Sequence, residues 1–329
     1  MTKQLATWQF ILNSLQKQIP VMLLYVLQSK GSSPGRRGFF MGVNAPGEMK
    51  GSIGGGIMEH KFVEMAKAHL QTSGYNIPGE KGHRKIILKK QVHDKAASEN
   101  QSGMICSGEQ TIVLYELNMA DATPLENIIH SLSQNENGTL QLSPAGIAFT
   151  DAAPKRNFEL EIHSETDWIY KEKTGYKNQL FIVGGGHCSL ALSALMSSMD
   201  FYIRLYDERS ALNSIEENDF VHEKHIVSSY SQLSTLIPSG KNHYVVIMTV
   251  GYRTDYEAIK ALLHKDFKYM GILGSRKKMD KLFAGLETEN VDIEKLNQAY
   301  TPIGIPIKSQ TPEEIAVSIA AEIIMIKNA

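Results

Sequence analysis

The stretch that decides the fold spans residues 179–189 and reads QLFIVGGGHCS. A short apolar run precedes three glycines, and apolar residues at helical spacing follow over 188–199, which predicts a strand, a tight turn and a helix. Gly184, Gly186 and Ser189 match the pattern G-x-G-x-x-small. In such turns glycine lets the backbone approach a phosphate, and the N–H groups at the helix start stabilise the anion.

An acidic residue follows this turn at the spacing that a dinucleotide site requires. Asp207 closes the next predicted strand, 21 positions after Gly186, where about 20 is expected for an acid that binds a ribose hydroxyl. The two features predict a nucleotide or phosphorylated-cofactor site that includes Gly184, His187 and Asp207. Arg209 favours an extra phosphate or, equally, a surface salt bridge. A scaffold whose glycines serve only packing is the alternative.

The second half of the chain alternates strands and helices. Further strands are predicted at 225–228, 244–249 and 269–273, with helical segments between them. This order predicts an α/β fold, a Rossmann-like doubly wound parallel sheet. Ser275 and Arg276 follow the last of these strands at the carboxyl edge, where ligands bind in such sheets. They suit a phosphate, or they belong to a solvated helix start.

The first half predicts a separate α+β domain. The polar stretch 171–175 is taken as the boundary, so the predicted domains are 1–174 and 175–329. The predicted elements of the first domain are helices at 1–18, 57–70 and 125–132 and strands at 21–27, 39–43, 85–89, 110–117, 140–150, 158–163 and 168–171. Thr311 to Glu314 forms a capping box with proline at the first helical position, which predicts the start of a C-terminal helix.

A second glycine loop, Gly54, Gly55 and Gly56, precedes the predicted helix 57–70. Consecutive glycines forfeit chain entropy, so a backbone constraint must require them. Their N–H groups can form an anion-binding nest, and Glu59 in the first helical turn is well placed with or without a ligand. A ligand loop and a tight structural turn both remain open.

Composition excludes several classes of function. The 329 residues hold 34 basic and 35 acidic side chains, so there is no basic footprint for nucleic acid. A hydrophobic content of 42% argues against disorder. Two cysteines, Cys106 and Cys188, cannot build a disulfide framework or a four-thiolate zinc site, and they favour a reducing cytoplasm. No apolar run approaches the ~18 residues of a membrane span. Cys106 is either a small buried hydrophobe or a reactive thiol.

Several separated motifs together resemble the XdhC/CoxI family, the xanthine dehydrogenase accessory factors. The matching segments, in chain order, are 31–41 (GSSPGRRGFFM), 51–59 (GSIGGGIME), 106–108 (CSG), 184–187 (GGGH), 207–209 (DER), 271–276 (GILGSR) and 302–316. The resemblance covers nearly the whole chain. Departures are Gly35 where the family often has arginine, Ser107 in place of the middle glycine of C-G-G, and Val250 in place of a histidine.

The resemblance implies a molybdenum-cofactor chaperone rather than a catalyst. Family members bind molybdopterin, protect it during sulfuration and pass it to an apo-molybdoenzyme such as xanthine dehydrogenase. They commonly associate as homodimers and with a cysteine desulfurase. The implied cofactor contacts are Gly54, Gly55, Gly56, Glu59, Cys106, Gly184, Gly186, His187, Asp207, Arg209, Ser275 and Arg276, with no protein metal cage.

Two other functions remain open. The first is an NAD(P)-dependent oxidoreductase that uses Gly184, Gly186 and Asp207, although the sequence offers no identifiable proton donor. The second is a protein–protein adaptor whose Rossmann half is a scaffold. The sequence leaves open which molybdoenzyme is served and whether the second domain holds a nucleotide or the pterin.

Overall fold

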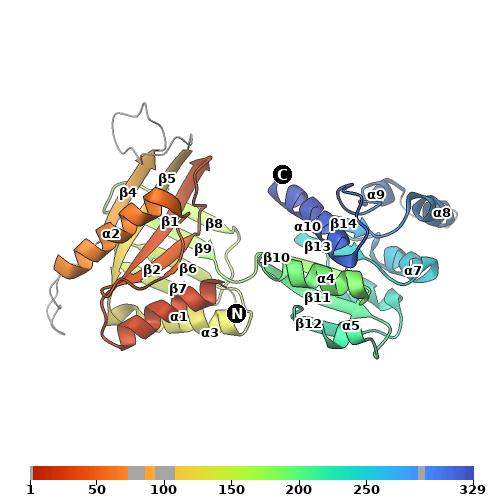
Figure 1. The fold of residues 1–329 in the computed structure, drawn as a ribbon, viewed down its shortest axis with the longest axis horizontal. Coiled ribbons are helices and arrows are strands. Elements are labelled where there is room, and N and C mark those ends of the chain that lie inside the picture. Colours follow the sequence, from red (N-terminus) through yellow and green to blue (C-terminus); the bar gives the residue numbers. More distant parts are fainter. Residues whose placement is uncertain (1–2, 73–85, 93–107, 288–292) are drawn as a thin grey trace. The chain divides into compact units, whose positions relative to one another are not determined.

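The fold comes from a computed structural model, which describes residues 3–72, 86–92, 108–287 and 293–329. The chain divides into two compact units, Met1–Gly175 and Tyr176–Ala329. The first is an α+β unit and the second is built around a parallel sheet, as the sequence predicts (Figure 1). None of the described helices combines the length and apolar character needed to cross a membrane.

The first unit contains a five-stranded and a four-stranded sheet, of strand order β3-β2-β1-β5-β4 and β7-β6-β9-β8, both antiparallel. Its elements are α1 (Lys3–Gln16), β1 (Val21–Gly31), β2 (Phe40–Asn44), β3 (Met49–Gly51), α2 (Gly56–Thr72), β4 (Ile86–Val92), β5 (Gly108–Leu117), the 3-10 turn η1 (Met119–Asp121), α3 (Ala122–Ser133), β6 (Thr139–Ser143), β7 (Gly146–Thr150), β8 (Phe158–Ile162) and β9 (Trp168–Lys173).

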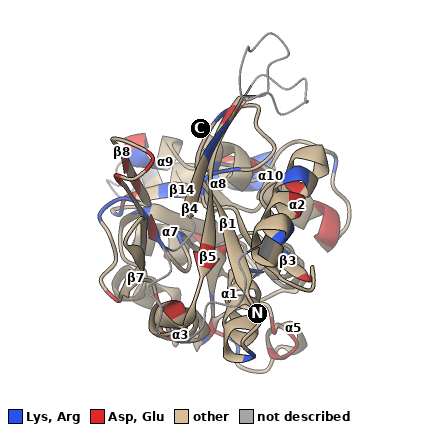
Figure 2. Cartoon of the chain, turned by 90° about the vertical axis from the view of Figure 1, so that its left-hand side faces the viewer, with Lys and Arg blue, Asp and Glu red and all other residues tan. Residues whose placement is uncertain are grey.

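Alternating side chains of β1 and β5 fill two cores in this unit. Leu23 and Val113 face α1, α3 and the four-stranded sheet, whereas Leu24 and Leu114 face α2. This alternation follows from the two-residue period of a strand that is buried on both faces. Charged residues of both signs are scattered over the face of the first unit drawn in Figure 2, among many uncharged positions.

The second unit has a parallel sheet of order β12-β11-β10-β13-β14. Its elements are β10 (Asn178–Val183), α4 (His187–Met196), β11 (Phe201–Asp207), α5 (Asn213–Glu216), β12 (Glu223–Ile226), η2 (Tyr230–Gln232), α6 (Leu233–Leu236), β13 (Gly240–Ile247), α7 (Tyr252–Leu262), β14 (Phe267–Ile272), α8 (Arg276–Glu287), α9 (Ile293–Asn297) and α10 (Pro312–Asn328).

Helices cover both faces of this sheet. α4 and α10 pack on one face, and α6, α7 and α8 pack on the other. The strand order reverses at β10, whose neighbours are β11 and β13. The turns that follow β10 and β13 therefore flank the switch point, where ligands bind in sheets of this kind.

Two local predictions in the first half are wrong. The single strand expected over 140–150 is a hairpin of β6 and β7, because Ser143 pairs with Gly146 and leaves Pro144 and Ala145 as the turn. Proline fixes φ and has no N–H to donate to a ladder, so it interrupts the strand. The polar stretch 171–175 was expected to link the domains, but residues 171–173 belong to β9.

Candidate functional site

The first glycine loop joins β3 to α2. Gly54, Gly55 and Gly56 have φ of +128°, +77° and +70°, a region that side chains disfavour. A Cβ at Gly54 would lie 2.3 Å from the backbone nitrogen of Gly35, so a close approach of two loops requires glycine there. At Gly55 and Gly56 no described atom lies within 4 Å of the position of a Cβ. The outer part of the loop is therefore open.

Glu59 already occupies the N–H groups of this loop. Its Oε2 accepts hydrogen bonds from the Ser52 hydroxyl (2.7 Å) and from the backbone N–H groups of Ile53 (2.8 Å) and Gly55 (3.0 Å). Burial by itself raises the pKa of Glu59, but these hydrogen bonds outweigh it and lower the pKa. Glu59 is therefore an anion at neutral pH, and the nest predicted from the sequence holds the chain's own carboxylate.

The loop at 31–38 packs directly against the glycine loop. A Cβ at Gly35 would lie 1.9 Å from the carbonyl oxygen of Ile53, and the Gly35 carbonyl accepts from the Gln110 side-chain nitrogen (2.6 Å). This bond fixes the orientation of the Gln110 amide, because the reverse orientation would oppose two oxygens. Gln110 Oε1 is buried without a hydrogen-bond partner among the described groups. Arg36 donates to the Gly31 carbonyl (2.9 Å) and so flanks the turn.

Cys106, the candidate thiol, lies outside the described residues, as does Ser107. The described chain resumes at Gly108, where a Cβ would lie 2.7 Å from the backbone nitrogen of Ser33. The start of β5 therefore runs beside the loop at 31–38. No role for Cys106 follows from this geometry.

The turn after β10 has the geometry that its glycines predict. Gly184 has a φ of +106°, and a Cβ there would lie 2.4 Å from the carbonyl oxygen of Met248. Gly186 is the N-cap of α4, and no described atom lies within 4 Å of the position of its Cβ. His187 is exposed at the start of the helix. The structure thus places Gly184, Gly186 and His187 together at the carboxyl edge.

Asp207 closes β11 beside this turn, and its side chain is inaccessible to solvent. Its Oδ2 accepts from the Gly185 N–H (2.6 Å) and from Arg209 Nη2 (2.7 Å). Its Oδ1 accepts from the Arg209 N–H (2.8 Å) and Nε (2.9 Å). Burial raises the pKa of Asp207, but the bonds from Arg209 and Gly185 lower it overall. The salt bridge that the sequence allowed for Arg209 is present.

Ser275 and Arg276 are exposed at the start of α8, on the same edge of the sheet. Ser275 Oγ accepts from the Lys278 N–H (3.3 Å), as a helix cap does. The sequence analysis missed the buried neighbour of this helix start. Asp255 Oδ1 accepts from the N–H (3.1 Å) and hydroxyl (2.5 Å) of Thr249, and its Oδ2 pairs with Lys278. A threonine ending a strand six residues before an aspartate was the available signal.

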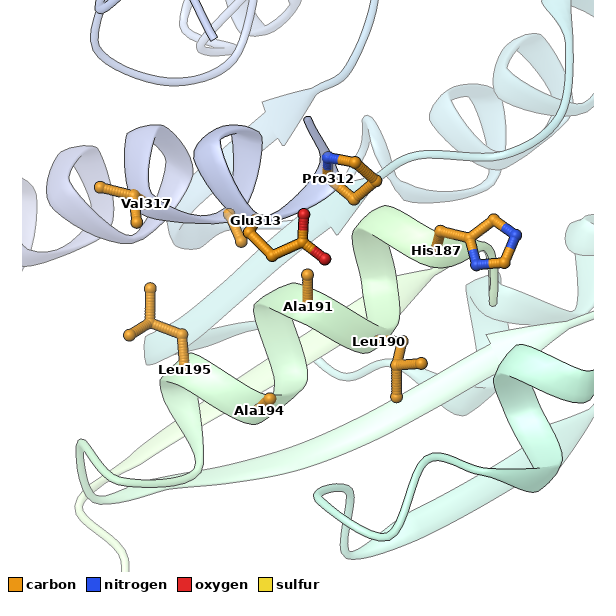
Figure 3. A pocket seen from close by; sticks show the side chains of 9 residues that line it. His187, Leu190, Ala191, Ala194, Leu195, Pro312, Glu313 and Val317 are labelled. Carbon is orange, nitrogen blue, oxygen red and sulfur yellow. The ribbon is translucent and has the colours of Figure 1, made fainter. Parts of the chain in front are cut away.

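A shallow groove of about 520 Å³ lies between α4 and α10 (Figure 3). Its lining residues are His187, Leu190, Ala191, Ala194, Leu195, Pro312, Glu313, Ala316 and Val317. The groove is mainly apolar, with His187 and Glu313 as its titratable groups. Over residues 3–72, 86–92, 108–287 and 293–329, no group of three or more His, Cys, Asp or Glu side chains could hold a metal ion.

Comparisons with known proteins identify the family. The family model described as the XdhC Rossmann domain matches residues 180–323, and that of the XdhC and CoxI family matches residues 14–77. The chain belongs to the XdhC/CoxI family. These matches cover both units, which confirms the resemblance drawn from the separated motifs.

Relatives of this XdhC/CoxI chain are distant and longer. It is 23% identical over 319 residues to the uncharacterized protein YqeB of Escherichia coli (strain K12), covering 95% of this chain and 44% of that protein. It is 25% identical over 164 residues to a protein of Bacillus subtilis (strain 168) that is named as a probable xanthine dehydrogenase subunit, covering 50% and 47%. The chain thus spans less than half the length of these two relatives.

A solved structure shares the fold. It is titled as a xanthine dehydrogenase from Bacillus halodurans and has a TM-score of 0.70 with this chain. The comparison covers 100% of this chain and 96% of that one, at 21% identity. The arrangement of sheets and helices described above therefore recurs in another protein.

Proposed function

We propose that this XdhC/CoxI protein is an accessory factor that holds the molybdenum cofactor, as molybdopterin, and delivers it to a xanthine dehydrogenase-type molybdoenzyme. Family membership and the names of the Bacillus relatives support the accessory role. The observation that carries the cofactor proposal is the open backbone at Gly55 and Gly56, at the start of the 17-residue helix α2. A helix start with bare glycine is suited to the phosphate of such a cofactor.

The residues of the first unit fit the other end of the cofactor as well. The edge of a pterin presents N–H donors, which need acceptors. Glu59 uses Oε2 for its three internal bonds, so Oε1 is the atom that can accept from a ligand. Gln110 Oε1 lies under the same pair of loops as a buried acceptor without a partner among the described groups. The cofactor carries its own dithiolene for molybdenum, so the protein needs no metal cage.

Retention of the cofactor tests this proposal. Purified chain is incubated anaerobically with extracted molybdopterin, passed over a desalting column and assayed for pterin by fluorescence after oxidation. We expect near-stoichiometric pterin with the wild type and at least about tenfold less with Glu59→Gln, because loss of one charged hydrogen-bond partner costs about 1.5–3 kcal/mol. Glu64→Gln is the matched control, since Glu64 is exposed on α2 and pairs with Lys67.

Failure of the wild type to retain pterin, beside an active known binder, would count against the cofactor proposal. Equal retention by Glu59→Gln and the wild type would leave cofactor binding standing and remove Glu59 from the site. Circular dichroism of each variant guards against loss of the fold.

The proposed partners are an apo-xanthine dehydrogenase or related molybdoenzyme, a cysteine desulfurase and a second copy of this chain. The relatives support the molybdoenzyme partner. Anaerobic purification of the tagged chain from cells that make a molybdoenzyme, with bound pterin and captured proteins read together, tests all three. Recovery of pterin-loaded chain without any molybdoenzyme, across growth conditions that induce one, would contradict delivery.

A further inference from the structure

We propose that the second unit is closed to the ribose of a dinucleotide, because Asp207 is saturated by internal hydrogen-bond donors, and that this sheet does not bind NAD(P). The claim is independent of molybdopterin binding. It removes the oxidoreductase function that the glycine pattern and Asp207 suggested. The supporting contacts lie at the ends of β10 and β11 and in α5.

A dinucleotide makes two demands on such a sheet. The pyrophosphate approaches the glycine turn, and the acid at the end of the second strand accepts hydrogen bonds from ribose hydroxyls. An acid in this role must offer lone pairs toward the ligand. A carboxylate has about four lone-pair sites in all.

All of these sites on Asp207 are taken by the chain itself. Gly185 provides one N–H donor, and Arg209 provides three, its backbone N–H, Nε and Nη2. The four donor–acceptor distances lie between 2.6 and 2.9 Å. The Asp207 side chain has no solvent-accessible surface, although that of Arg209 is 39% exposed. A ribose hydroxyl therefore finds neither a free lone pair nor access.

Arg209 does not substitute as a binding group. An arginine near the second strand can accommodate the 2′-phosphate of NADP. Here two guanidinium nitrogens are directed at Asp207, in the fork geometry that makes arginine–carboxylate pairs strong. Turning this side chain toward a phosphate would leave a buried carboxylate without its cation, which is unfavourable.

Helix α5 covers the middle of the glycine turn. Ser214 Oγ donates to the Gly185 carbonyl (2.6 Å), and a Cβ at Gly185 would lie 2.4 Å from the Ile215 side chain. Gly185 is buried by these contacts. Gly186 stays open, so the closed part of the edge is the part next to β11, where the acid would meet the ribose.

Binding of NADH and NADPH to the full chain tests the closure. We expect no saturable change in nicotinamide fluorescence up to about 1 mM, the upper end of ordinary substrate constants. A known NAD-dependent dehydrogenase serves as the positive control. Saturable binding by the wild type that weakens at least about tenfold in Asp207→Asn, but not in Arg253→Met, would overturn the proposal.

A second measurement reads the closed contact directly and needs no variant. The Gly185 amide, hydrogen-bonded to Asp207, is followed by NMR in full-length protein labelled with ¹⁵N-glycine. We expect its resonance to stay unchanged when NADH is added to about 1 mM. A progressive shift with NADH would mean that Asp207 turns to a ribose, and the proposal would be wrong. That outcome would leave molybdopterin retention by the first unit untouched.

Discussion

Glu172 lies in a polar stretch of the sequence, yet its side chain is 2% exposed. Its Oε2 accepts from the hydroxyl groups of Tyr25 (2.5 Å) and Tyr170 (2.6 Å). A carboxylate that is buried with hydrogen-bond donors holds the four-stranded sheet to β1, whereas the same residue without them would be unfavourable. The partner of Tyr25 is 147 positions away along the chain, so no local pattern could reveal this contact.

Tyr25→Phe is expected to lower the free energy of unfolding by about 1.5–3 kcal/mol at pH 7, because it removes a hydrogen bond to a charged acceptor. Urea unfolding, followed by circular dichroism, measures this loss. The exposed residue Tyr252 gives the control, since Tyr252→Phe should change stability by less than about 0.5 kcal/mol. Equal losses in the two variants would contradict the role of the Glu172 contact.

The same tyrosine predicts a loss of stability in alkali. Burial and the adjacent Glu172 raise the pKa of Tyr25 well above its ordinary value, so the folded state keeps a proton that the unfolded chain releases above about pH 10. Stability from this group is full below about pH 10 and falls above it by up to about 1.4 kcal/mol per pH unit. Urea unfolding between pH 9 and about 11 should show a shallower fall in Tyr25→Phe. Parallel curves would contradict the assignment.

At the scale of elements, the sequence predicted most of what hydrophobic periodicity determines. The strands of the second unit are apolar runs bounded by turns, and the capping box at Thr311 begins α10 as expected. The hairpin at 143–146 was missed because apolar residues continue on both sides of Pro144. The glycine loops and Glu59 were located from spacing, but the bonds of Glu59 and Asp207 depend on side-chain direction, which spacing does not determine.

Adjacent glycines in one loop predict different costs of substitution. Gly55→Ala should destabilise the protein by about 1–2 kcal/mol, the cost of a side chain in the left-handed region, since no described atom crowds it. Gly54→Ala should cost at least about twice as much, because its Cβ would also lie 2.3 Å from the backbone of Gly35. Thermal unfolding of the pair decides. A larger loss in Gly55→Ala would contradict the packing of the two loops.

The cap of α10 makes a second prediction for a single element. Thr311 Oγ1 accepts from the Glu314 N–H (3.2 Å), and Glu314 accepts in return from the Thr311 N–H (3.3 Å). Thr311→Ala should lower stability by about 1 kcal/mol, whereas Thr311→Ser should keep it within a few tenths. Denaturant unfolding compares them, and equal losses would show that the hydroxyl is not what matters.

On the scale of the whole molecule, each unit has cores of its own. The buried residues cluster into four groups, two within 1–175 and two within 176–329. A unit that buries its own apolar surface can unfold cooperatively by itself. The Tyr25 contact and the Asp207 contact therefore belong to different stability units.

This division predicts independent responses in hydrogen exchange. Tyr25→Phe should lower the protection of slowly exchanging amides in β1 and β5 and leave those in β10 and β13 within about 0.5 kcal/mol of the wild type. Hydrogen-exchange mass spectrometry on the full chain, with Tyr252→Phe alongside, measures both units at once. Equal loss of protection in the two sheets would mean that the units unfold together.

The saturated Asp207 also bears on how an oxidoreductase could arise from this scaffold. Loss of Arg209 alone would strand a buried charge, and retreat of Ile215 alone would leave the carboxylate neutralised. Neither single genotype gains a usable sugar acceptor, and the first is less stable than its parent. Acquisition of nicotinamide chemistry here would thus require coupled changes, crossing an intermediate that selection disfavours.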